Sequence, residues 1–461
     1  MSTFKEHMPG AFEKKSYSQS PLAGPLVGVN VCVIGGGFVG LVSAAGFAQF
    51  GHKVICVEKE NRRLEMLRDG QIPFYERDLE ELVRNNMQCG RLSFSNDLHE
   101  SVNGQQAIFV TVGTPQTSTG RADLGSLYDV ATALSDSLND GQVVVLKSTV
   151  PVGTARTVKS LLEQNGRRSR PIAVINNPEF LREGTSVFDF FHPQRIVIGG
   201  DDADAIELVK HIYRLGMTRP VPIVVTNNET AEIIKYASNA FLATKVGFIN
   251  ELAGLCDQVG VNVLEVAHAM GLDPRIGSDF LSPGPGWGGS CFPKDISEFV
   301  GLAESKGLPL LITKAVQDAN LRQFELVVGK VRKLVGNLAG SQIGILGLSF
   351  KAGTSDMRSS PSIPIIQKLL DGGARLRAYD PAANSEAASI FPQIEFAENA
   401  QGVARGADCV LVLTEWPEFQ LLDWQKMAES MENRNLVDAR NLLSPEVAER
   451  FGFKYSGMGQ V

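Results

Sequence analysis

The stretch that decides the fold runs from Val29 to Glu60 and reads VNVCVIGGGFVGLVSAAGFAQFGHKVICVEKE. It opens with an apolar run and breaks into three consecutive glycines. Apolar residues at helical spacing follow, and a second apolar run then ends in acid. This order predicts a strand, a glycine loop, a helix and a second strand, which together form the right-handed βαβ unit of a parallel sheet.

The glycines of this unit have the spacing of a dinucleotide-binding loop. Gly35 permits the tight turn, Gly37 lets the backbone approach a pyrophosphate, and Gly40 permits close packing of helix on strand. The free N–H groups of the following helix attract phosphates. Glu58 stands 18 residues after Gly40, where a carboxylate can accept ribose hydrogen bonds and repel a 2′-phosphate. We therefore predict NAD rather than NADP.

Two observations limit this interpretation. A glycine-rich turn that binds no ligand is the alternative, although the complete strand–loop–helix–strand unit disfavours it. Arg62 and Arg63 follow Glu58 closely, and their positive charges weaken the preference for NAD over NADP.

Composition excludes several classes of protein. At roughly 150 residues per domain, the 461 residues predict about three domains. Hydrophobic residues make up 43% and charged residues 21%, so the chain can form sizeable cores and is not disordered. The net charge of −7 disfavours non-specific binding to nucleic acid or to anionic membranes. No uninterrupted apolar run reaches the length of a transmembrane helix.

Cysteine usage and the N-terminus indicate a cytoplasmic protein. The six cysteines form no CxxC pair, and no histidine lies at zinc-ligand spacing from them. We therefore expect neither a disulfide framework nor a metal site, and a reducing compartment fits. Residues 1–27 lack an apolar run of signal-peptide length, so we expect a flexible extension.

The pattern along the chain predicts an α/β fold in which two Rossmann-like parallel-sheet domains are joined by a long central helix. Strand-like runs alternate with helical segments in both end regions. Between them, 34 residues from Asn227 to Gly260 keep a helical pattern without proline. The expected parts are the extension 1–27, a nucleotide-binding domain 28–215, a central helical domain 216–324 and a C-terminal α/β domain 325–461.

Two short motifs follow predicted strands. VGTP (112–115) carries Thr114, and KSTVPVGT (147–154) carries Thr149. Ligands of open parallel sheets bind beyond the carboxyl ends of strands, where small hydroxyl side chains suit a nicotinamide pocket. Taken alone, each motif favours a helix cap or a turn over a ligand site.

Two pairs of polar residues stand four residues apart. Glu179 and Glu183, in NPEFLREG, would share one face if that segment were helical, and paired carboxylates suit water activation or hydroxyl binding. A solvated acidic helix face is the alternative. Lys235 and Asn239 lie on the long helix among apolar residues, where a cation beside an amide can bind an oxyanion or a hydroxyl. A snorkelling lysine beside a cap is the alternative there.

The most informative motif is GPGWGGSCFPKD (284–295). Its glycines and prolines form a loop that can approach a ligand, and Pro293 suits the first residue of a new helix. Cys291 would then lie at a helix N-terminus, where partial positive charge lowers the pKa of a thiol. Asp295 lies within reach of the same site. We expect the other cysteines to be buried and inert; these are Cys32, Cys56, Cys89, Cys256 and Cys409.

These motifs together resemble the nucleotide-sugar 6-dehydrogenase family, most closely its UDP-glucose branch. The resemblance runs from Val29 to about Arg440, and in chain order it is carried by NPEFLREG, AEIIKYASNAFLATKVGFINE, GLDPRIG and GGSCFPKD. It implies an NAD-binding domain, a central helix used for dimerisation and a C-terminal domain that holds UDP. It also implies a homodimer or larger homo-oligomer, and oxidation of UDP-glucose to UDP-glucuronate through a cysteine thiohemiacetal and thioester, with two NAD molecules per sugar.

The resemblance also assigns roles to residues of this sequence. The implied catalytic residues are Cys291 as nucleophile, Lys235 and Asn239 as the pair that stabilises the oxyanion and positions substrate, Asp295 and Thr149 as holders of a water, and Glu179 as the carboxylate that activates water. The implied NAD contacts are Gly35, Gly37, Phe38, Val39, Gly40, Glu58, Arg63, Thr114, Thr149, Glu183, Lys294 and Arg358. The implied substrate contacts are Phe180, Leu181, Arg182, Lys235, Asn239, Arg275 (toward the neighbouring subunit), Gly288, Phe350, Lys351 and Arg440.

The sequence departs from the family pattern at three places. Trp287 stands where Tyr or Phe is usual, Gln194 stands where Asp is frequent, and extra residues follow Pro115. Trp287 leaves open a GDP-mannose or UDP-N-acetylhexosamine 6-dehydrogenase. A non-catalytic nucleotide-sugar binding protein would not need Cys291 and Lys235, and a two-electron hydroxyacid dehydrogenase would not need the thiol.

Overall fold

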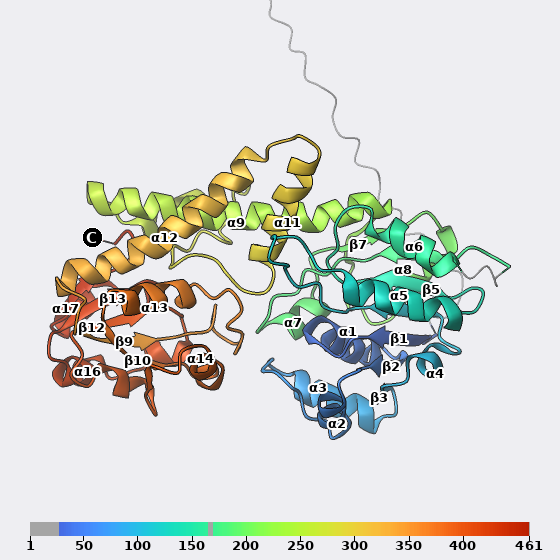
Figure 1. The fold of residues 1–461 in the computed structure, drawn as a ribbon, viewed down its shortest axis with the longest axis horizontal. Coiled ribbons are helices and arrows are strands. Elements are labelled where there is room, and N and C mark those ends of the chain that lie inside the picture. Colours follow the sequence, from blue (N-terminus) through green and yellow to red (C-terminus); the bar gives the residue numbers. More distant parts are fainter. Residues whose placement is uncertain (1–26, 165–168, 461) are drawn as a thin grey trace, which may run out of the picture.

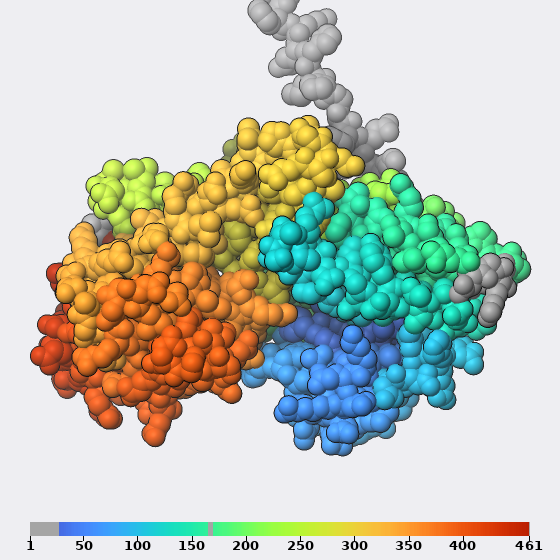
Figure 2. Space-filling view, in the orientation of Figure 1, coloured from blue at the N-terminus to red at the C-terminus, as the bar shows by residue number. Residues whose placement is uncertain are grey.

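The computed structural model describes residues 27–164 and 169–460. Two α/β domains lie at opposite ends of the molecule, and a layer of long helices spans both of them (Figure 1). A hollow separates the two α/β domains below these helices (Figure 2). Of the expected extension 1–27, only Val27 lies within the described residues.

The N-terminal domain is built on an eight-stranded sheet with the order β3-β2-β1-β4-β5-β6-β7-β8. The strands are β1 (Asn30–Ile34), β2 (Lys53–Val57), β3 (Leu92–Ser95), β4 (Ala107–Val110), β5 (Val143–Leu146), β6 (Ala173–Asn176), β7 (Ile196–Gly199) and β8 (Ile223–Thr226). The helices are α1 (Phe38–Gln49), α2 (Asn61–Arg68), α3 (Leu79–Gln88), α4 (Leu98–Val102), α5 (Gly125–Ser137), α6 (Thr154–Glu163), α7 (Ser186–Phe191) and α8 (Ala203–Arg214).

This sheet is buried on both faces, as its continuous apolar runs require. Strands β4 and β5 are buried at every position. Their side chains alternate between two hydrophobic clusters, one beneath α1 and α8 and the other beneath α5 and α6. The parallel order is broken only where β7 runs antiparallel to β6, with Asn176 opposite Gly199. The prediction of a doubly wound sheet is therefore confirmed, with one reversed strand pair.

Four helices form the central layer: α9 (Asn228–Val259), α10 (Val263–Gly271), α11 (Phe292–Ser305) and α12 (Leu311–Val335). The 32 residues of α9 confirm the predicted long helix. The Asn227 side chain caps its first turn by accepting a hydrogen bond from the N–H of Thr230. Gly260 ends it with φ +71°, a conformation that favours glycine.

The C-terminal domain has a six-stranded parallel sheet with the order β11-β10-β9-β12-β13-β14. Its strands are β9 (Gln342–Leu346), β10 (Arg375–Tyr379), β11 (Glu395–Phe396), β12 (Cys409–Val412), β13 (Asn435–Asp438) and β14 (Lys454–Ser456). Its helices are α13 (Ser362–Asp371), α14 (Asn384–Ile390), η1 (Ala400–Ala404), α15 (Pro417–Gln420), α16 (Trp424–Ser430) and α17 (Pro445–Arg450).

Helix α12 links the central layer to the C-terminal domain. Phe324, Val327, Val328 and Val331 of this helix are part of the C-terminal hydrophobic core. The predicted boundary between residues 324 and 325 thus falls inside α12, where the sequence has no proline or loop composition to mark it. Among the described residues, no helix is long and apolar enough to span a bilayer.

Candidate active site

The glycine loop between β1 and α1 has the geometry that a dinucleotide needs. Gly35 has φ +108°, and a Cβ on Gly40 would lie 1.8 Å from the Gly35 carbonyl oxygen, so both positions require glycine. A Cβ on Gly37 would meet nothing within 4 Å, which leaves open space beside the loop. Helix α1 begins there without a capping side chain or an acidic residue in its first turn, so its N–H groups stay available to a pyrophosphate.

Glu58 lies beside this loop at the end of β2. Its Oε2 accepts a hydrogen bond from the N–H of Gly36 at 3.2 Å, and its Oε1 accepts one from the N–H of Glu60 at 2.9 Å. The Arg63 Nη1 atom lies 3.4 Å from the same carboxylate. Arg63 is thus paired with Glu58 rather than free to bind a 2′-phosphate. This pairing weakens the objection from sequence that the charge of Arg63 favours NADP.

The loops after β4 and β5, which carry the two predicted threonines, contact each other. The Thr114 hydroxyl donates to the carbonyl of Thr149 at 2.9 Å. Two buried carboxylates from the central helices hold these loops. Glu232 of α9 accepts from the N–H groups of Gly153 (2.6 Å) and Ala155 (2.9 Å).

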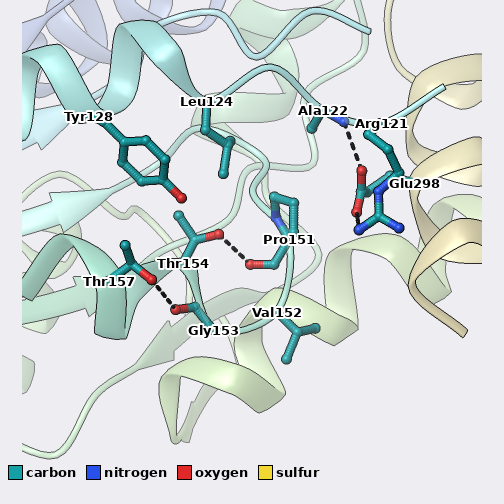
Figure 3. A pocket seen from close by; sticks show the side chains of 10 residues that line it. All are labelled: Arg121, Ala122, Leu124, Tyr128, Pro151, Val152, Gly153, Thr154, Thr157 and Glu298. Atoms are coloured by element: carbon teal, nitrogen blue, oxygen red, sulfur yellow. Dashed lines mark hydrogen bonds and ion pairs between the residues drawn. The ribbon is translucent and has the colours of Figure 1, made fainter. Parts of the chain in front are cut away.

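The second of these carboxylates is Glu298 of α11. It accepts from the N–H of Ala122 at 2.7 Å and pairs with Arg121 at 2.8 Å, as Figure 3 shows. A cavity of about 390 Å³ lies between this contact and the first turn of α6, where Tyr128 and Thr154 line it. Both loops that flank the predicted nicotinamide pocket are therefore tied to the central helices.

Lys235 and Asn239 are both buried on α9, so a snorkelling lysine is excluded. The Lys235 Nζ donates to the Glu179 carbonyl at 2.8 Å and to Glu179 Oε1 at 3.0 Å. The Asn239 amide donates to Asp295 Oδ2 at 2.6 Å. The structure thus brings four predicted catalytic residues together.

Charge determines the protonation of the Lys235–Glu179 pair. Burial alone would raise the pKa of Glu179, but the Lys235 charge and hydrogen bonds outweigh it and lower that pKa below its usual range. Burial alone would lower the pKa of Lys235, but the negative charges beside it, above all that of Glu179, outweigh burial and raise that pKa. Both groups are therefore ionised at neutral pH.

Cys291 is the N-cap residue of α11, as predicted, and Pro293 is the second helical residue rather than the first. The predicted direction of its thiol pKa is wrong. Burial raises that pKa, and the positive charge of Lys235 offsets the increase only in part. The resting thiol is therefore protonated, because burial and the nearby carboxylates Glu179 and Asp295 outweigh the charge of Lys235. A second correction concerns Cys89, which is exposed rather than buried.

The segment that carries Glu179 and Glu183 is not helical, so the two carboxylates do not share a helix face. Residues 177–182 are irregular and a turn follows, because β6 has only just ended and Pro178 disfavours helix in the preceding residue. Glu179 points to Lys235, whereas Glu183 accepts from the Ser290 hydroxyl at 2.7 Å. Neither is a solvated surface carboxylate.

The C-terminal domain adds residues around this loop. The Arg358 Nη2 lies 3.4 Å from Glu183 Oε1, and the Arg440 Nη2 donates to the Phe350 carbonyl at 3.2 Å. A Cβ on Gly288 would lie 2.1 Å from the Ser359 carbonyl oxygen, so glycine is required for this close approach. The C-terminal domain therefore packs directly against the loop 284–291 and against Glu183.

The remaining predicted residues lie around this core at different depths. Phe180 stacks against Arg195, with the guanidinium carbon 3.7 Å from the ring centroid. The N–H of Leu181 donates to Glu179 Oε2 at 2.5 Å, and Arg182 pairs with Asp189. Lys294 pairs with Asp295 at 2.5 Å. Two further predicted residues are Lys351, which is half-buried near Glu183, and Arg275, which is exposed and paired with Asp273. Trp287, which departs from the family pattern, is buried, and its indole nitrogen has no hydrogen-bond partner among the described residues.

Three residues of the site were not predicted from sequence. Ser290 lies inside the cysteine motif, Glu232 stands three residues before Lys235, and Glu298 lies two helical turns after Cys291. The two glutamates stand at helical spacing from predicted catalytic residues, and this spacing could have indicated that they lie on the same side of their helices as the site. Their partners lie more than 70 residues away in the chain, so only the fold identifies those contacts.

Comparisons with known proteins match this architecture. The NAD-binding domain of the UDP-glucose/GDP-mannose dehydrogenase family matches residues 29–216, its central domain 229–322 and its UDP-binding domain 344–445. The UDP-glucose 6-dehydrogenase of Rhizobium meliloti (strain 1021) is 42% identical over 94% of this chain and 100% of its own length.

Solved structures agree with this match. A UDP-glucose dehydrogenase from the hyperthermophilic archaeon Pyrobaculum islandicum has a TM-score of 0.87 at 36% identity, over 94% of this chain and 98% of that one. A UDP-D-ManNAc dehydrogenase from Pyrococcus horikoshii has a TM-score of 0.83 at 26% identity, over 94% and 99% of the two chains.

The geometry of Glu58 predicts a preference between the two nicotinamide cofactors. We expect kcat/KM with NAD to exceed that with NADP by roughly tenfold or more, since about 1.4 kcal/mol of charge repulsion suffices for this ratio. Replacing Glu58→Gln should narrow the ratio, because it removes the repulsion and frees Arg63. Equal efficiency of the unmodified protein with both cofactors would contradict the prediction.

Proposed function

The chain belongs to the UDP-glucose/GDP-mannose dehydrogenase family of NAD-dependent enzymes, and from that premise we propose that it oxidises C6 of UDP-glucose twice to give UDP-glucuronate. The observation that carries the proposal is the grouping of Cys291 with Lys235 and Asn239 between the NAD-binding domain and the UDP-binding domain. A two-electron dehydrogenase has no use for a thiol in that place.

NAD fits the first domain, where the glycine loop and Glu58 would hold its pyrophosphate and ribose. When bound, NAD supplies the acceptor for each of the two hydrides. Thr114 and Thr149 lie on the loops that would flank its nicotinamide, and Glu232 and Glu298 fix those loops. Phe350, Lys351 and Arg440 would contact the UDP part of the substrate.

Each catalytic residue has one task in the proposed chemistry. After the first oxidation, the sulfur of Cys291 adds to the C6 aldehyde, which keeps that reactive product from escaping. The Lys235 ammonium and the second N–H of the Asn239 amide stabilise the resulting oxyanion. The second oxidation leaves a thioester on Cys291. Glu179, which is ionised, then accepts a proton from the water that hydrolyses this thioester.

UDP-glucose is the proposed substrate within the family because two similar proteins that cover most of the chain are named for it. The Rhizobium meliloti and Pyrobaculum islandicum proteins, at 42% and 36% identity, are named for UDP-glucose. The UDP-D-ManNAc enzyme, at 26%, shares the architecture at greater distance.

A homodimer is the proposed assembly. Phe241, Phe248 and Leu255 follow one another at seven-residue spacing on α9, with Val259 one turn on, and all four are exposed. A heptad stripe of this kind on a 32-residue helix suits the same helix of a second copy.

The four-electron reaction predicts a stoichiometry. With UDP-glucose limiting, each sugar should yield two NADH and no free aldehyde, because the thioester forms only after the second hydride has left. NADH absorbance and mass spectrometry of the product measure this, and GDP-mannose and UDP-N-acetylmannosamine serve as comparison substrates. One NADH per sugar with a released aldehyde would contradict the four-electron reaction, and faster turnover of a comparison substrate would contradict the choice of sugar.

Removing the Lys235 ammonium should affect turnover more than binding. Lys235→Ala should lower kcat by about 10²–10³, because the oxyanion that it stabilises exists only in the transition state and the intermediate. The substitution leaves the buried Glu179 carboxylate without its ion-pair partner, so the thermal unfolding of the variant is measured alongside its activity. Lys314→Ala, at an exposed lysine of α12, is the matched control and should leave kcat unchanged. Normal kcat with weakened UDP-glucose binding would make Lys235 an ordinary substrate contact.

The apolar stripe predicts the effect of charge on assembly. The double substitution Phe241→Asp and Phe248→Asp should convert the dimer into a monomer, because like charges would face each other across the interface. Light scattering after size-exclusion chromatography measures the mass. Leu421→Asp, at an exposed leucine of the C-terminal domain, should leave the dimer intact. A monomeric unmodified protein, or a dimeric double variant, would contradict the proposed interface.

A further inference from the structure

Ser290 lies between the nucleophile and a carboxylate that the proposed chemistry leaves without a catalytic task. Its Oγ atom is 3.6 Å from the Sγ atom of Cys291, within hydrogen-bond distance for sulfur. The same Oγ atom is 2.7 Å from Oε1 of Glu183. The three groups thus form a continuous chain from thiol to carboxylate.

When Glu183 is ionised, the proton count of each group sets the direction of the hydrogen bonds in this chain. A hydroxyl group has one proton, and an ionised carboxylate can only accept. The Ser290 hydroxyl therefore donates to Glu183, and the contact with sulfur must be one in which Ser290 accepts the S–H proton. Each donor in this chain thus points toward Glu183, which is the direction that a proton transfer from Cys291 to Glu183 requires.

We propose that Glu183 is the base for the Cys291 thiol and that the Ser290 hydroxyl relays the proton between them. This inference rests on the proposed function, since it concerns the step in which sulfur adds to the aldehyde. It gives Ser290 a catalytic role that the family resemblance did not assign, and it gives Glu183 a role beyond contact with the cofactor.

The proton movements balance over one catalytic cycle. As the S–C6 bond forms, the C=O π bond opens to an oxyanion held by Lys235 and Asn239. The S–H proton passes to Ser290, while the Ser290 proton passes to Glu183. When water cleaves the thioester, the thiolate leaves and takes this proton back along the same path. The relay therefore consumes no proton overall and needs no further reactant.

The other ionisable groups that face Cys291 are poor bases for this step. Lys235 is protonated and already donates to Glu179, so it cannot accept a proton. Glu179 accepts from Lys235 on one oxygen and from the N–H of Leu181 on the other, and within the described residues no hydrogen bond connects it to the thiol. Asp295 accepts from Asn239 on one oxygen and from Lys294 on the other. Glu183 is the carboxylate linked to the thiol through a hydroxyl.

The surroundings of Glu183 increase its affinity for a proton. Burial, and then the charge of Asp356, raise the pKa of Glu183 to about 7, against the opposing effects of the Ser290 hydrogen bond and the Arg358 charge. Lys351 also faces it, and burial lowers the pKa of that lysine. Within the described residues, the Oε2 atom of Glu183 is buried without a hydrogen-bond partner. The relayed proton would arrive on the other oxygen, Oε1, to which the Ser290 hydroxyl donates.

The loop that carries Ser290 is fixed by its glycines. Gly289 has φ +85°, and a Cβ there would lie 2.8 Å from the ring of Phe350. Gly288 packs still more closely, since a Cβ there would lie 2.1 Å from the Ser359 carbonyl oxygen. These contacts with the C-terminal domain hold the segment next to Ser290 in place.

The test measures the second oxidation by itself. Single-turnover NADH formation is followed with the 6-aldehyde of UDP-glucose and NAD, for the unmodified protein and for Ser290→Ala, Ser290→Thr and Glu183→Gln. Loss of a positioned proton acceptor costs roughly 10²–10⁴ in rate. We expect Ser290→Ala and Glu183→Gln to lose about 10²-fold or more, while Ser290→Thr keeps the hydroxyl and stays within a few-fold. Ser305→Ala, at the exposed end of α11, is the matched control.

The pH profile separates a relay from a purely structural role. Glu183 accepts a proton only when ionised, so the rate in the unmodified protein should fall as pH drops through about 7. This decrease should be absent in Glu183→Gln. A Ser290→Ala variant with normal rate and an unchanged pH profile would overturn the relay alone. An unmodified protein that consumes neither UDP-glucose nor its aldehyde would overturn the proposed function and the relay together.

Discussion

The site depends on one buried positive charge, the ammonium group of Lys235. It donates to both the backbone carbonyl and the carboxylate of Glu179, and it lies above the ring of Phe180. An isolated charge at this depth would be unstable, and removal of one member of a buried pair costs about 3–5 kcal/mol. The irregular segment after β6 therefore has to stay against α9. The same charge partly offsets the effect of burial on the thiol of Cys291.

The central helices connect this charge to the rest of the site. On α9, Glu232 holds the loop after β5, and Lys235 and Asn239 follow on the same helix. On α11, Cys291 and Asp295 stand at the start, and Glu298 holds the loop after β4 two turns later. Each helix thus carries reacting groups at one position and a backbone contact to the nucleotide-binding domain at another. This arrangement explains why the two α/β domains need long helices between them rather than a flexible linker.

Much of the fold and part of the site could be predicted from sequence. The βαβ unit, the 32-residue α9 and the Lys235–Asn239 pair follow from local spacing, which periodicity reports directly. The condition under which Glu179 and Glu183 would share a helix face is not met, because a strand end and a proline disfavour helix there. The pKa of Cys291 was wrong in direction because desolvation depends on packing that sequence does not contain. The contacts of Glu232, Glu298 and Ser290 also depend on residues distant in the chain.

The most direct test of this account is to trap the acyl group on sulfur. Enzyme, UDP-glucose and NAD would be mixed, quenched in acid within one turnover, digested and analysed by mass spectrometry of the peptide that contains Cys291. In Glu179→Gln, where water is no longer activated, we predict that most of this peptide carries the mass of the sugar nucleotide acyl group. A Cys291 peptide that stays unmodified while product accumulates, or an adduct on another residue, would contradict the account.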